Sequence, residues 1–272
     1  MRRRVLLYAL LALTLSGIIL ALCTAMGETA KWPAKSSGGE KTNSKLKVDV
    51  GNASEGYFLA AVTQKNKHKV KLRVEKDGET LTYDLNTTGK YEVFPLQLGS
   101  GKYSLSLWEN VSGKKFSAAG KITVNVKLKR EDGAFLYPNQ YVNYRKNDQA
   151  VGMSQKICKD KEGKEAYTAI KQYITENFRY DYVKAAKIQP SEMPDIDSCF
   201  ANKSGVCQDL SALMACMLRV QGIPARLAIG YADKTYHAWV VCEVEGEKIL
   251  FDPTAAVNKT DNASKYSVER YY

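Results

Sequence analysis

The chain has 272 residues, a hydrophobic fraction of 44%, a charged fraction of 25% and a formal net charge of +11. This length and apolar content exclude a disordered chain and allow two domains, each with a core of its own. The lysines are spread over the whole sequence and form no single block, which argues against nucleic-acid binding. A basic surface of this kind suits anionic wall polymers, lipid headgroups or simple solvation.

Residues 1–26 predict a targeting segment. Arg2, Arg3 and Arg4 precede an apolar run of 18 residues, VLLYALLALTLSGIILAL, which is typical of a signal peptide or a membrane anchor. Cys23 follows in the sequence LALC, which resembles a bacterial lipoprotein box and makes this cysteine a candidate for lipidation, although Leu22 stands where such boxes have a small residue. Cleavage, lipidation and retention stay open. All three predict an extracytoplasmic protein, secreted or anchored at the cell surface, that contacts the membrane only through this segment.

Two regions of different character follow. Residues 27–45 are rich in Lys, Ser, Gly and Thr without apolar periodicity, and they predict a flexible tether. Residues 46–128 consist of short alternating segments such as VKLRVEKD and KITVNVKL, separated by Gly, Asn and Ser. They predict an immunoglobulin-like β-sandwich of six or seven strands that acts as a spacer or packing partner. The aromatic connecting segment, residues 129–149, is expected to pack across the next domain.

Residues 150–272 predict a second domain, which makes the fold class α+β. A helix is expected at Glu165–Phe178, where apolar residues recur at helical spacing. A second helix is expected at Val206–Val220, with Gly222 beyond its end as a C-cap. The apolar face of this second helix should pack on a sheet and comprises Leu210, Leu213, Met214, Met217 and Leu218.

Cys207 lies in the first turn of the second helix. The positive end of the helix dipole and the unpaired N–H groups there favour the thiolate form of a cysteine. Cys216 lies in the middle of the same helix on its apolar side, where burial favours the neutral thiol. The two cysteines are therefore not equivalent, and Cys207 is the candidate nucleophile.

Three strands are predicted after this helix, at Ala225–Ala232, His237–Val244 and Lys248–Thr254. A two-residue turn between the last two strands would set Val244 opposite Glu247, and a four-residue turn would set Glu243 opposite Lys248. His237 and Asp252 would then be diagonal neighbours on one face, roughly 7–8 Å apart at the backbone. A three-residue turn would place them on opposite faces.

Cys207, His237 and Asp252 can together supply a nucleophile, a base and a carboxylate that orients the base. The chain has only two histidines, and His68 is a poor alternative base because it lies in the lysine-rich run QKNKHKVKL, with no cysteine near it. The spacing therefore predicts a Cys-His-Asp triad assembled from three elements.

The pieces GVC, D, LRVQGIPAR, GY, HAW and DPT, in this order, resemble the core of the transglutaminase-like superfamily, relatives of the papain-like fold. The resemblance covers about residues 150–260. It implies a papain-like transglutaminase core with Cys207 as nucleophile, His237 as base and Asp252 as the orienting residue. It also implies acyl transfer through a thioester, with water or an amine as the acceptor.

Such chemistry needs an oxyanion hole. The backbone N–H of Cys207 is one expected donor, and Tyr180 is the candidate for the second because a phenol can donate. Gln172 and Tyr182 are the alternatives. Trp239 and Tyr231 are expected to form wall or core, and Arg219 and Arg226 to pair with acidic groups such as Asp209 or to be solvated.

Six cysteines are present, and setting Cys23 aside leaves five. This odd number agrees with one reactive thiol plus structural cysteines, and Cys158 with Cys199 could form a bridge or stay free. No cofactor is expected, and no spacing of His and Cys indicates zinc or another metal.

The sequence thus predicts an extracytoplasmic thiol enzyme that acts on peptide or amide bonds of protein, peptide or cell-wall substrates. Hydrolysis is favoured over transamidation because transamidation needs a site that excludes water. A protein-crosslinking transglutaminase and a non-catalytic surface binding module with a vestigial triad are the alternatives.

Overall fold

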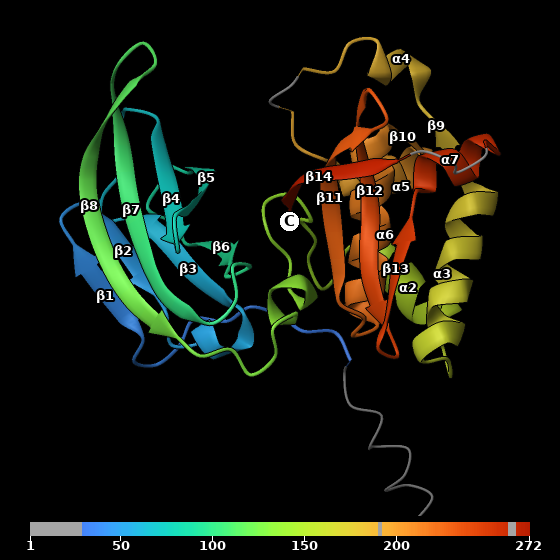
Figure 1. The fold of residues 1–272 in the computed structure, drawn as a ribbon, viewed down its shortest axis with the longest axis horizontal. Helices are drawn as coiled ribbons and strands as arrows, with labels where there is room; N and C mark the ends of the chain where they lie inside the picture. The colour runs from blue at the N-terminus through green and yellow to red at the C-terminus, as the bar shows by residue number, and fades with distance from the viewer. Residues whose placement is uncertain (1–28, 190–191, 261–264) are drawn as a thin grey trace, which may run out of the picture. The chain divides into compact units, whose positions relative to one another are not determined.

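The structure is a computed structural model that describes residues 29–189, 192–260 and 265–272 (Figure 1). The predicted targeting segment, with Cys23, lies outside these residues. In the described part of the chain, each helix is too short or too polar to cross a lipid bilayer.

The N-terminal region is β-rich and contains two four-stranded antiparallel sheets. The first has the order β1-β2-β3-β6, with β1 (Glu40–Asn43), β2 (Leu46–Asp49), β3 (Tyr57–Val62) and β6 (Glu92–Pro95). The second has the order β5-β4-β7-β8, with β4 (Val70–Lys76), β5 (Glu79–Leu85), β7 (Gly101–Ser112) and β8 (Lys115–Val126). A short 3₁₀ helix, η1 (Ala53–Glu55), precedes β3.

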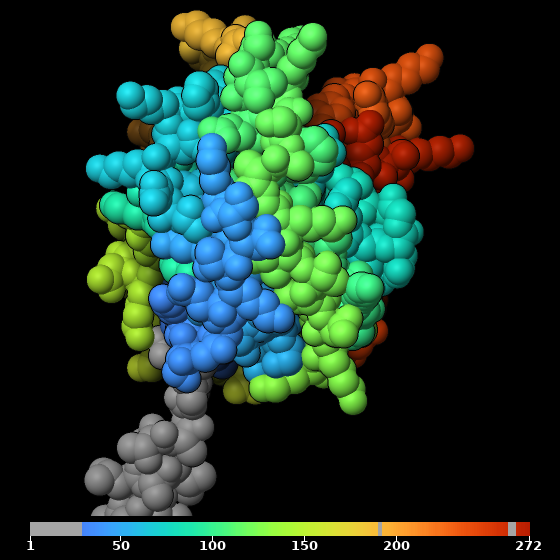
Figure 2. Space-filling view, turned by 90° about the vertical axis from the view of Figure 1, so that its left-hand side faces the viewer, coloured from blue at the N-terminus to red at the C-terminus, as the bar shows by residue number. Residues whose placement is uncertain are grey.

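The two sheets share an apolar core. Phe58 on β3 and Phe94 on β6 are fully buried, and the ring of Tyr83 on β5 meets Phe94 edge-on at 5.3 Å between centroids. The two sheets are hydrogen-bonded to each other at one edge, where the N–H of Lys45, in the turn between β1 and β2, donates to the carbonyl of Ala119 on β8. In Figure 2 the blue surface of the β1–β2 hairpin therefore lies beside the green surface of β8. The immunoglobulin-like assignment of this region stays a prediction.

The last residues of the flexible tether expected at residues 27–45 form a β-strand in the structure. Glu40–Asn43 forms β1, which pairs with β2 through a turn at Ser44. Further upstream, the Ser36 hydroxyl and N–H both donate to the buried carboxylate of Asp49. Polar residues without apolar periodicity are ordered here because an edge strand needs backbone partners more than apolar side chains.

The C-terminal region has a four-stranded antiparallel sheet with the order β13-β12-β11-β14. Its strands are β11 (Ala225–Ala232), β12 (Thr235–Val244), β13 (Glu247–Phe251) and β14 (Tyr266–Tyr271). The helices are α2 (Gln149–Ile157), α3 (Gly163–Asn177), α4 (Tyr182–Ala185), α5 (Ile196–Asn202), α6 (Cys207–Val220) and α7 (Pro253–Asn258). A short parallel pair, β9 (Arg179–Tyr180) and β10 (Ser204–Gly205), precedes α6.

Helix α6 lies at the centre of this region. It packs on β11 and β12 on one side and contacts α2, α3 and α5 on the other (Figure 1). The sequence predicted one apolar face, but every residue from Asp209 to Val220 is buried. The helix ends as expected, with Gly222 just beyond it in the left-handed region at φ +71°.

The β12–β13 hairpin has the predicted register, with Val244 opposite Glu247 and a two-residue turn at Glu245 and Gly246. The strand predicted at Lys248–Thr254 is shorter, because β13 ends at Phe251. Asp252 is instead the N-cap of α7, and its side chain accepts hydrogen bonds from the N–H groups of Thr254 and Ala255.

The connecting segment contains a second 3₁₀ helix, η2 (Gly133–Leu136), and it packs on the C-terminal region as expected. Arg219 on α6 anchors it, since Nη1 donates to the carbonyl of Tyr137 at 2.6 Å. Nε donates to the carbonyl of Ala225, and Nη2 to that of Tyr272. The expected acidic partner or solvation of Arg219 is therefore wrong, because this fully buried side chain is bound by three backbone carbonyls.

Candidate active site

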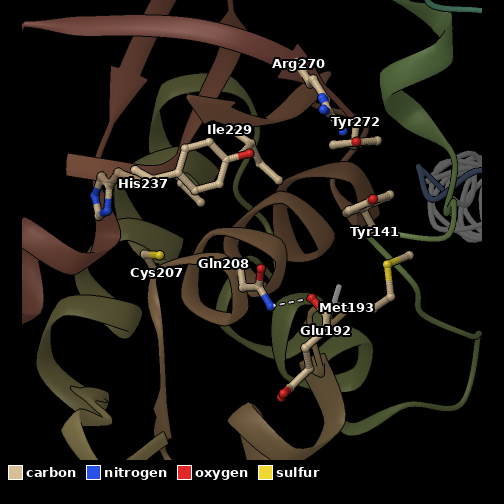
Figure 3. Close-up of a pocket in the computed structure, with 11 residues that line it drawn as sticks. Tyr141, Glu192, Met193, Cys207, Gln208, Ile229, His237, Arg270 and Tyr272 are labelled. Carbon is tan, nitrogen blue, oxygen red and sulfur yellow. Dashed lines mark hydrogen bonds between the residues drawn. The ribbon is translucent and has the colours of Figure 1, made fainter. Parts of the chain in front are cut away.

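The site is built around the N-terminus of α6. Val206 is the N-cap of the helix and Cys207 is its first residue, so the thiol lies at the positive end of the helix dipole. Cys207 is half-buried, whereas the other four described cysteines are buried. It lines a pocket of about 110 Å³ together with His237, and Figure 3 shows these two side chains at the same end of it.

The structure brings the three predicted residues together. The imidazole Nε2 of His237 lies 2.8 Å from Oδ2 of Asp252, and the ring also hydrogen-bonds the side chain of Cys207. Because Nε2 faces the carboxylate, Nδ1 is the ring nitrogen available to the sulfur. The arrangement runs from thiol to imidazole to carboxylate, with each side chain from a different element.

The electrostatics couple these groups. Burial lowers the pKa of His237, but hydrogen bonds and charge from Asp252 and Cys207 outweigh it and raise the pKa to about 9. Burial likewise raises the pKa of Asp252, but the hydrogen bond and charge of His237 dominate and hold it below its usual value. His237 is therefore cationic and Asp252 anionic at neutral pH.

Comparison with known proteins bears on this geometry. The family model of the transglutaminase-like superfamily matches residues 151–253, which run from α2 to the first residue of α7. This stretch contains Cys207, His237 and Asp252. Residues 151–253 form a transglutaminase-like domain. A search of curated proteins finds no match to this sequence.

Solved structures resemble the chain at low identity. A candidate cysteine protease from Cytophaga hutchinsonii is 18% identical with a TM-score of 0.41, over 80% of this chain and 79% of the other. The periplasmic domain of TgpA from Pseudomonas aeruginosa, bound to ethylmercury, is 15% identical with a TM-score of 0.38, over 77% and 95%. A structure described as a TGase is 18% identical with a TM-score of 0.35, over 44% of this chain and 33% of the other.

Of the three candidates for the second oxyanion donor, Tyr180 is the one that the structure sets beside the start of α6 and within the influence of the charge of Cys207. The parallel pairing of β9 with β10 sets Tyr180 opposite Gly205, two residues before Cys207. Burial raises the pKa of the Tyr180 phenol, and the charge of Cys207 adds to the rise. Tyr182 is 69% exposed, and the amide of Gln172 is bound to Glu176 on the surface of α3.

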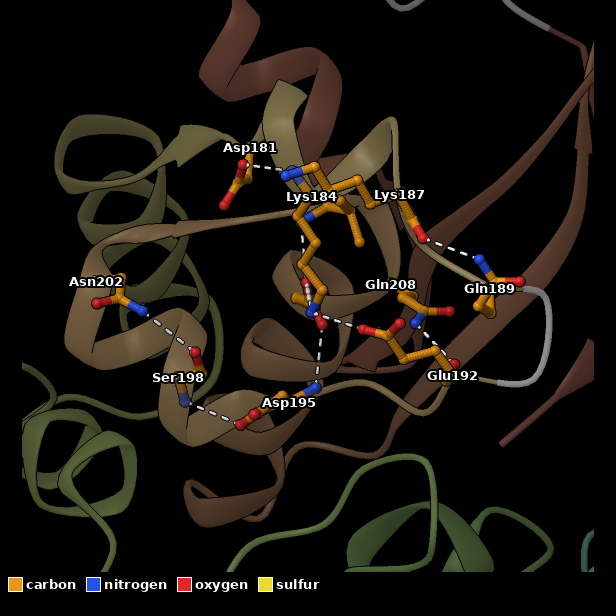
Figure 4. A network of polar contacts seen from close by, with 11 residues as sticks. Asp181, Lys184, Lys187, Gln189, Glu192, Asp195, Ser198, Asn202 and Gln208 are labelled. Carbon is orange, nitrogen blue, oxygen red and sulfur yellow. Dashed lines mark hydrogen bonds and ion pairs between the residues drawn. The ribbon is translucent and has the colours of Figure 1, made fainter.

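A polar network fixes the first turn of α6 (Figure 4). Asp209 is only 1% exposed, and its carboxylate accepts from the N–H groups of Val206 and Asp195 and from Nζ of Lys184 at 2.8 Å. The Gln208 amide donates to the carbonyl of Glu192. These bonds tie α4 and the segment before α5 to the turn that carries Cys207.

The Asp252 carboxylate has a further donor that the sequence did not reveal. The hydroxyl of Tyr266 on β14 donates to Oδ2 at 2.9 Å, the same oxygen that faces His237. The Tyr266 ring packs on Trp239 with centroids 4.7 Å apart, and Trp239 is fully buried beneath the His237 ring. Trp239 is thus core, as predicted.

Other predicted residues have structural positions. Tyr231 is 40% exposed and packs edge-on against Tyr236, which lines the pocket. The Arg226 guanidinium is partly exposed and lies 4.2 Å from the ring centroid of Phe135, so of the two expectations for it, an acidic partner or solvation, the acidic partner is wrong. Arg270 and Tyr272 line the end of the pocket away from Cys207 (Figure 3).

The remaining cysteines do not form the bridge considered for Cys158 and Cys199, since all five described cysteines are free thiols. Burial raises the pKa of Cys158 to about 11 and that of Cys199 to about 12. Burial also raises the pKa of Cys216 well above its usual value. Among the described residues, no group of three or more His, Cys, Asp or Glu side chains is arranged to hold a metal ion.

Proposed function

We propose that this protein is a thiol enzyme that acts on peptide or amide bonds through a thioester on Cys207. One observation carries the proposal: a half-buried cysteine at a helix N-terminus lines a pocket and is hydrogen-bonded to an imidazole that is itself bound to a buried carboxylate. This is the arrangement that nucleophilic catalysis by a thiol requires.

In the first half-reaction, the proton of the Cys207 thiol already lies on Nδ1 of His237, which is cationic at neutral pH, and the sulfur of Cys207 attacks the carbonyl carbon of the substrate. The N–H of Cys207, which has no partner within the helix, and the hydroxyl of Tyr180 are the proposed donors to the oxyanion. As the C–N bond breaks, His237 gives its proton to the leaving amine. The acyl group is then held as a thioester.

In the second half-reaction, His237 removes a proton from water, the water oxygen attacks the thioester, and the sulfur leaves as a thiolate beside the imidazolium as the carboxylic acid forms. We favour water over an amine because the pocket that Cys207 lines opens to solvent at a half-buried residue. Asp252 holds the imidazole in one orientation and stabilises its cationic form throughout.

Thiol alkylation tests this proposal without knowledge of the substrate. Iodoacetamide at pH 6 should modify Cys207 much faster than Cys158, Cys199, Cys216 and Cys242, as read by peptide mass spectrometry. Equal rates for the five cysteines in the folded protein would contradict it and favour a non-catalytic scaffold.

A second assay separates hydrolysis from crosslinking. The protein is incubated with a glutamine-containing peptide and a labelled primary amine. Release of ammonia or peptide cleavage without label supports hydrolysis, whereas incorporation of the label would show a transglutaminase.

We also propose that residues 1–26 direct the protein out of the cytoplasm, which would bring the site to peptide or wall substrates. Cell fractionation of the full chain tests this, with Cys23→Ser as the control for lipid attachment. Recovery of the protein only in the cytoplasm would contradict it.

A further inference from the structure

We propose that Tyr266 is a positioning residue of the active site, whose hydroxyl holds the Asp252 carboxylate in the orientation that His237 needs. This inference rests on the proposed function, since it assigns a role within the same site. Tyr266 lies beyond the stretch that matches the transglutaminase-like superfamily, which ends at residue 253.

The Asp252 carboxylate is bound on both oxygens. Oδ1 accepts from the N–H of Thr254 at 2.8 Å and from that of Ala255 at 3.1 Å, at the start of α7. Oδ2 accepts from Tyr266 at 2.9 Å and lies 2.8 Å from Nε2 of His237. Rotation about the Cβ–Cγ bond moves both oxygens, and the Tyr266 hydroxyl adds a third donor, on Oδ2, that opposes any rotation away from His237.

The position of Tyr266 depends on how β14 joins the sheet. β14 pairs with β11 with a register shift between Ile229 and Gly230. A Cβ at Gly230 would lie 2.0 Å from the carbonyl oxygen of Ser267, so the strand could not approach with any other residue there. The close approach at Gly230 therefore sets the strand that carries Tyr266 beside Asp252.

The hydroxyl also affects the charge of the site. Asp252 is 5% exposed, and a buried carboxylate needs donors to remain ionised. The other titratable groups that act on this pair are His237 on β12, Cys207 on α6 through the imidazole, and Asp233 in the turn between β11 and β12. Loss of the Tyr266 donor makes protonation of Asp252 easier, so the imidazolium loses its partner at a higher pH.

The test uses the Tyr266→Phe variant of the full chain. It removes the hydroxyl and keeps the ring that packs on Trp239. Tyr271→Phe is the matched control, because Tyr271 lies in the same strand and its hydroxyl has no hydrogen-bond partner within the described residues. The rate of Cys207 carboxamidomethylation by iodoacetamide is measured from pH 3 to pH 9.

In Tyr266→Phe the acid limb of this profile should move up by about one pH unit, the size expected for one hydrogen bond to a buried charge. Tyr271→Phe should leave the limb in place. In an Asp252→Asn background, adding Tyr266→Phe should cause no further shift. An unchanged acid limb in Tyr266→Phe would overturn the inference, and so would loss of folding, since a positioning hydroxyl is not needed for the fold.

A second readout separates this inference from the proposed function. If Cys207 is not selectively alkylated in the unmodified protein, the proposed function fails, but Asp252 still binds His237. The ¹H NMR titration of the His237 ring then reports on Tyr266. A His237 titration that is identical in the unmodified protein and in Tyr266→Phe would overturn the positioning role independently of thiol chemistry.

Discussion

The two ends of α6 differ in exposure and in the contacts that their side chains make. At the N-terminal end, Cys207 is half-buried, lines a pocket and contacts a charged imidazole. At the C-terminal end, Arg219 is fully buried, and its guanidinium is bound by the backbone oxygens of three separate segments. One end leaves room for a reactant, and the other leaves none.

This difference shows how one helix can serve chemistry and stability. Burial of Arg219 without a carboxylate side chain as partner lowers its pKa to about 10, and its guanidinium offsets this cost by donating to three backbone carbonyls. The helix is thus fixed at its far end, which holds the near end still for Cys207. Changes at Arg219 should alter stability, and changes at Cys207 or His237 should alter reactivity.

Arg219→Met should have the largest effect. It removes three buried hydrogen bonds to carbonyls, of which, within the described residues, only that of Tyr272 keeps another donor, the N–H of Leu227, so we expect the free energy of unfolding to fall by about 3 kcal/mol or more. Urea unfolding followed by circular dichroism measures it. Arg226→Met is the control, because it removes only a contact with an aromatic ring and should cost about 1 kcal/mol. Equal losses in both variants would mean that the carbonyl contacts of Arg219 contribute little.

His237→Ala should lower the reactivity of Cys207. An ordinary thiol with a pKa of about 8.5 is roughly 3% thiolate at pH 7, so loss of the imidazolium should slow Cys207 alkylation about 10- to 30-fold. The rate constant with iodoacetamide is the measurement, and His68→Ala in the lysine-rich loop is the matched control. A rate that is unaffected by His237→Ala would separate the cysteine from the proposed base.

The pH dependence should follow the raised pKa of His237. Since the folded-state pKa of about 9 exceeds the unfolded value of about 6.5, the stabilisation from His237 is complete below pH 6.5 and is lost as pH rises to 9. The chain has two histidines, so NMR of the unmodified protein and of His68→Gln identifies the His237 signal. Cys207→Ser removes the sulfur whose hydrogen bond and charge help to raise the pKa of His237, and should lower the pKa of His237 by about one unit. A midpoint near 6.5 in both would contradict the coupling.

Replacing either cysteine of α6 with serine should have the smallest effect on stability among these predictions, and the effect should differ between the two positions. Cys216→Ser places a hydroxyl in a fully buried apolar position and should lower the free energy of unfolding by about 1–2 kcal/mol. Cys207→Ser at the half-buried end should change it by less than about 0.5 kcal/mol. Thermal unfolding of both variants is the measurement, and the reverse order would show that the two ends have been assigned wrongly.

Local patterns explain what the sequence could predict. The position of Cys207 followed from apolar periodicity, and the register of β12 and β13 followed from the two-residue turn at Glu245 and Gly246. The sequence also contained a signal for Asp252 as a helix N-cap, because Asp at the N-cap followed by Pro at the first helical position is a common start of a helix. The sequence DPT was instead interpreted as the end of a strand.

Contacts between distant segments explain what could not be predicted. Tyr266 reaches Asp252 only because β14 pairs with β11, and strand pairing at long range leaves no periodic signal. The carbonyls around Arg219 come from Tyr137, Ala225 and Tyr272, and no property of these side chains marks their backbone oxygens. The polar residues before β2 gave no sign of β1 for the same reason.

The late place of β14 in the chain has a consequence for biosynthesis. When the ribosome has made α6, the β12–β13 hairpin and α7, the nascent polypeptide already contains Cys207, His237 and Asp252. It still lacks β14, which brings Tyr266 to the Asp252 carboxylate, and the backbone oxygen of Tyr272, to which Nη2 of Arg219 donates. The hydrogen bond between Tyr266 and Asp252 can therefore form only after β14 has been synthesised, later than the three residues that it is proposed to serve.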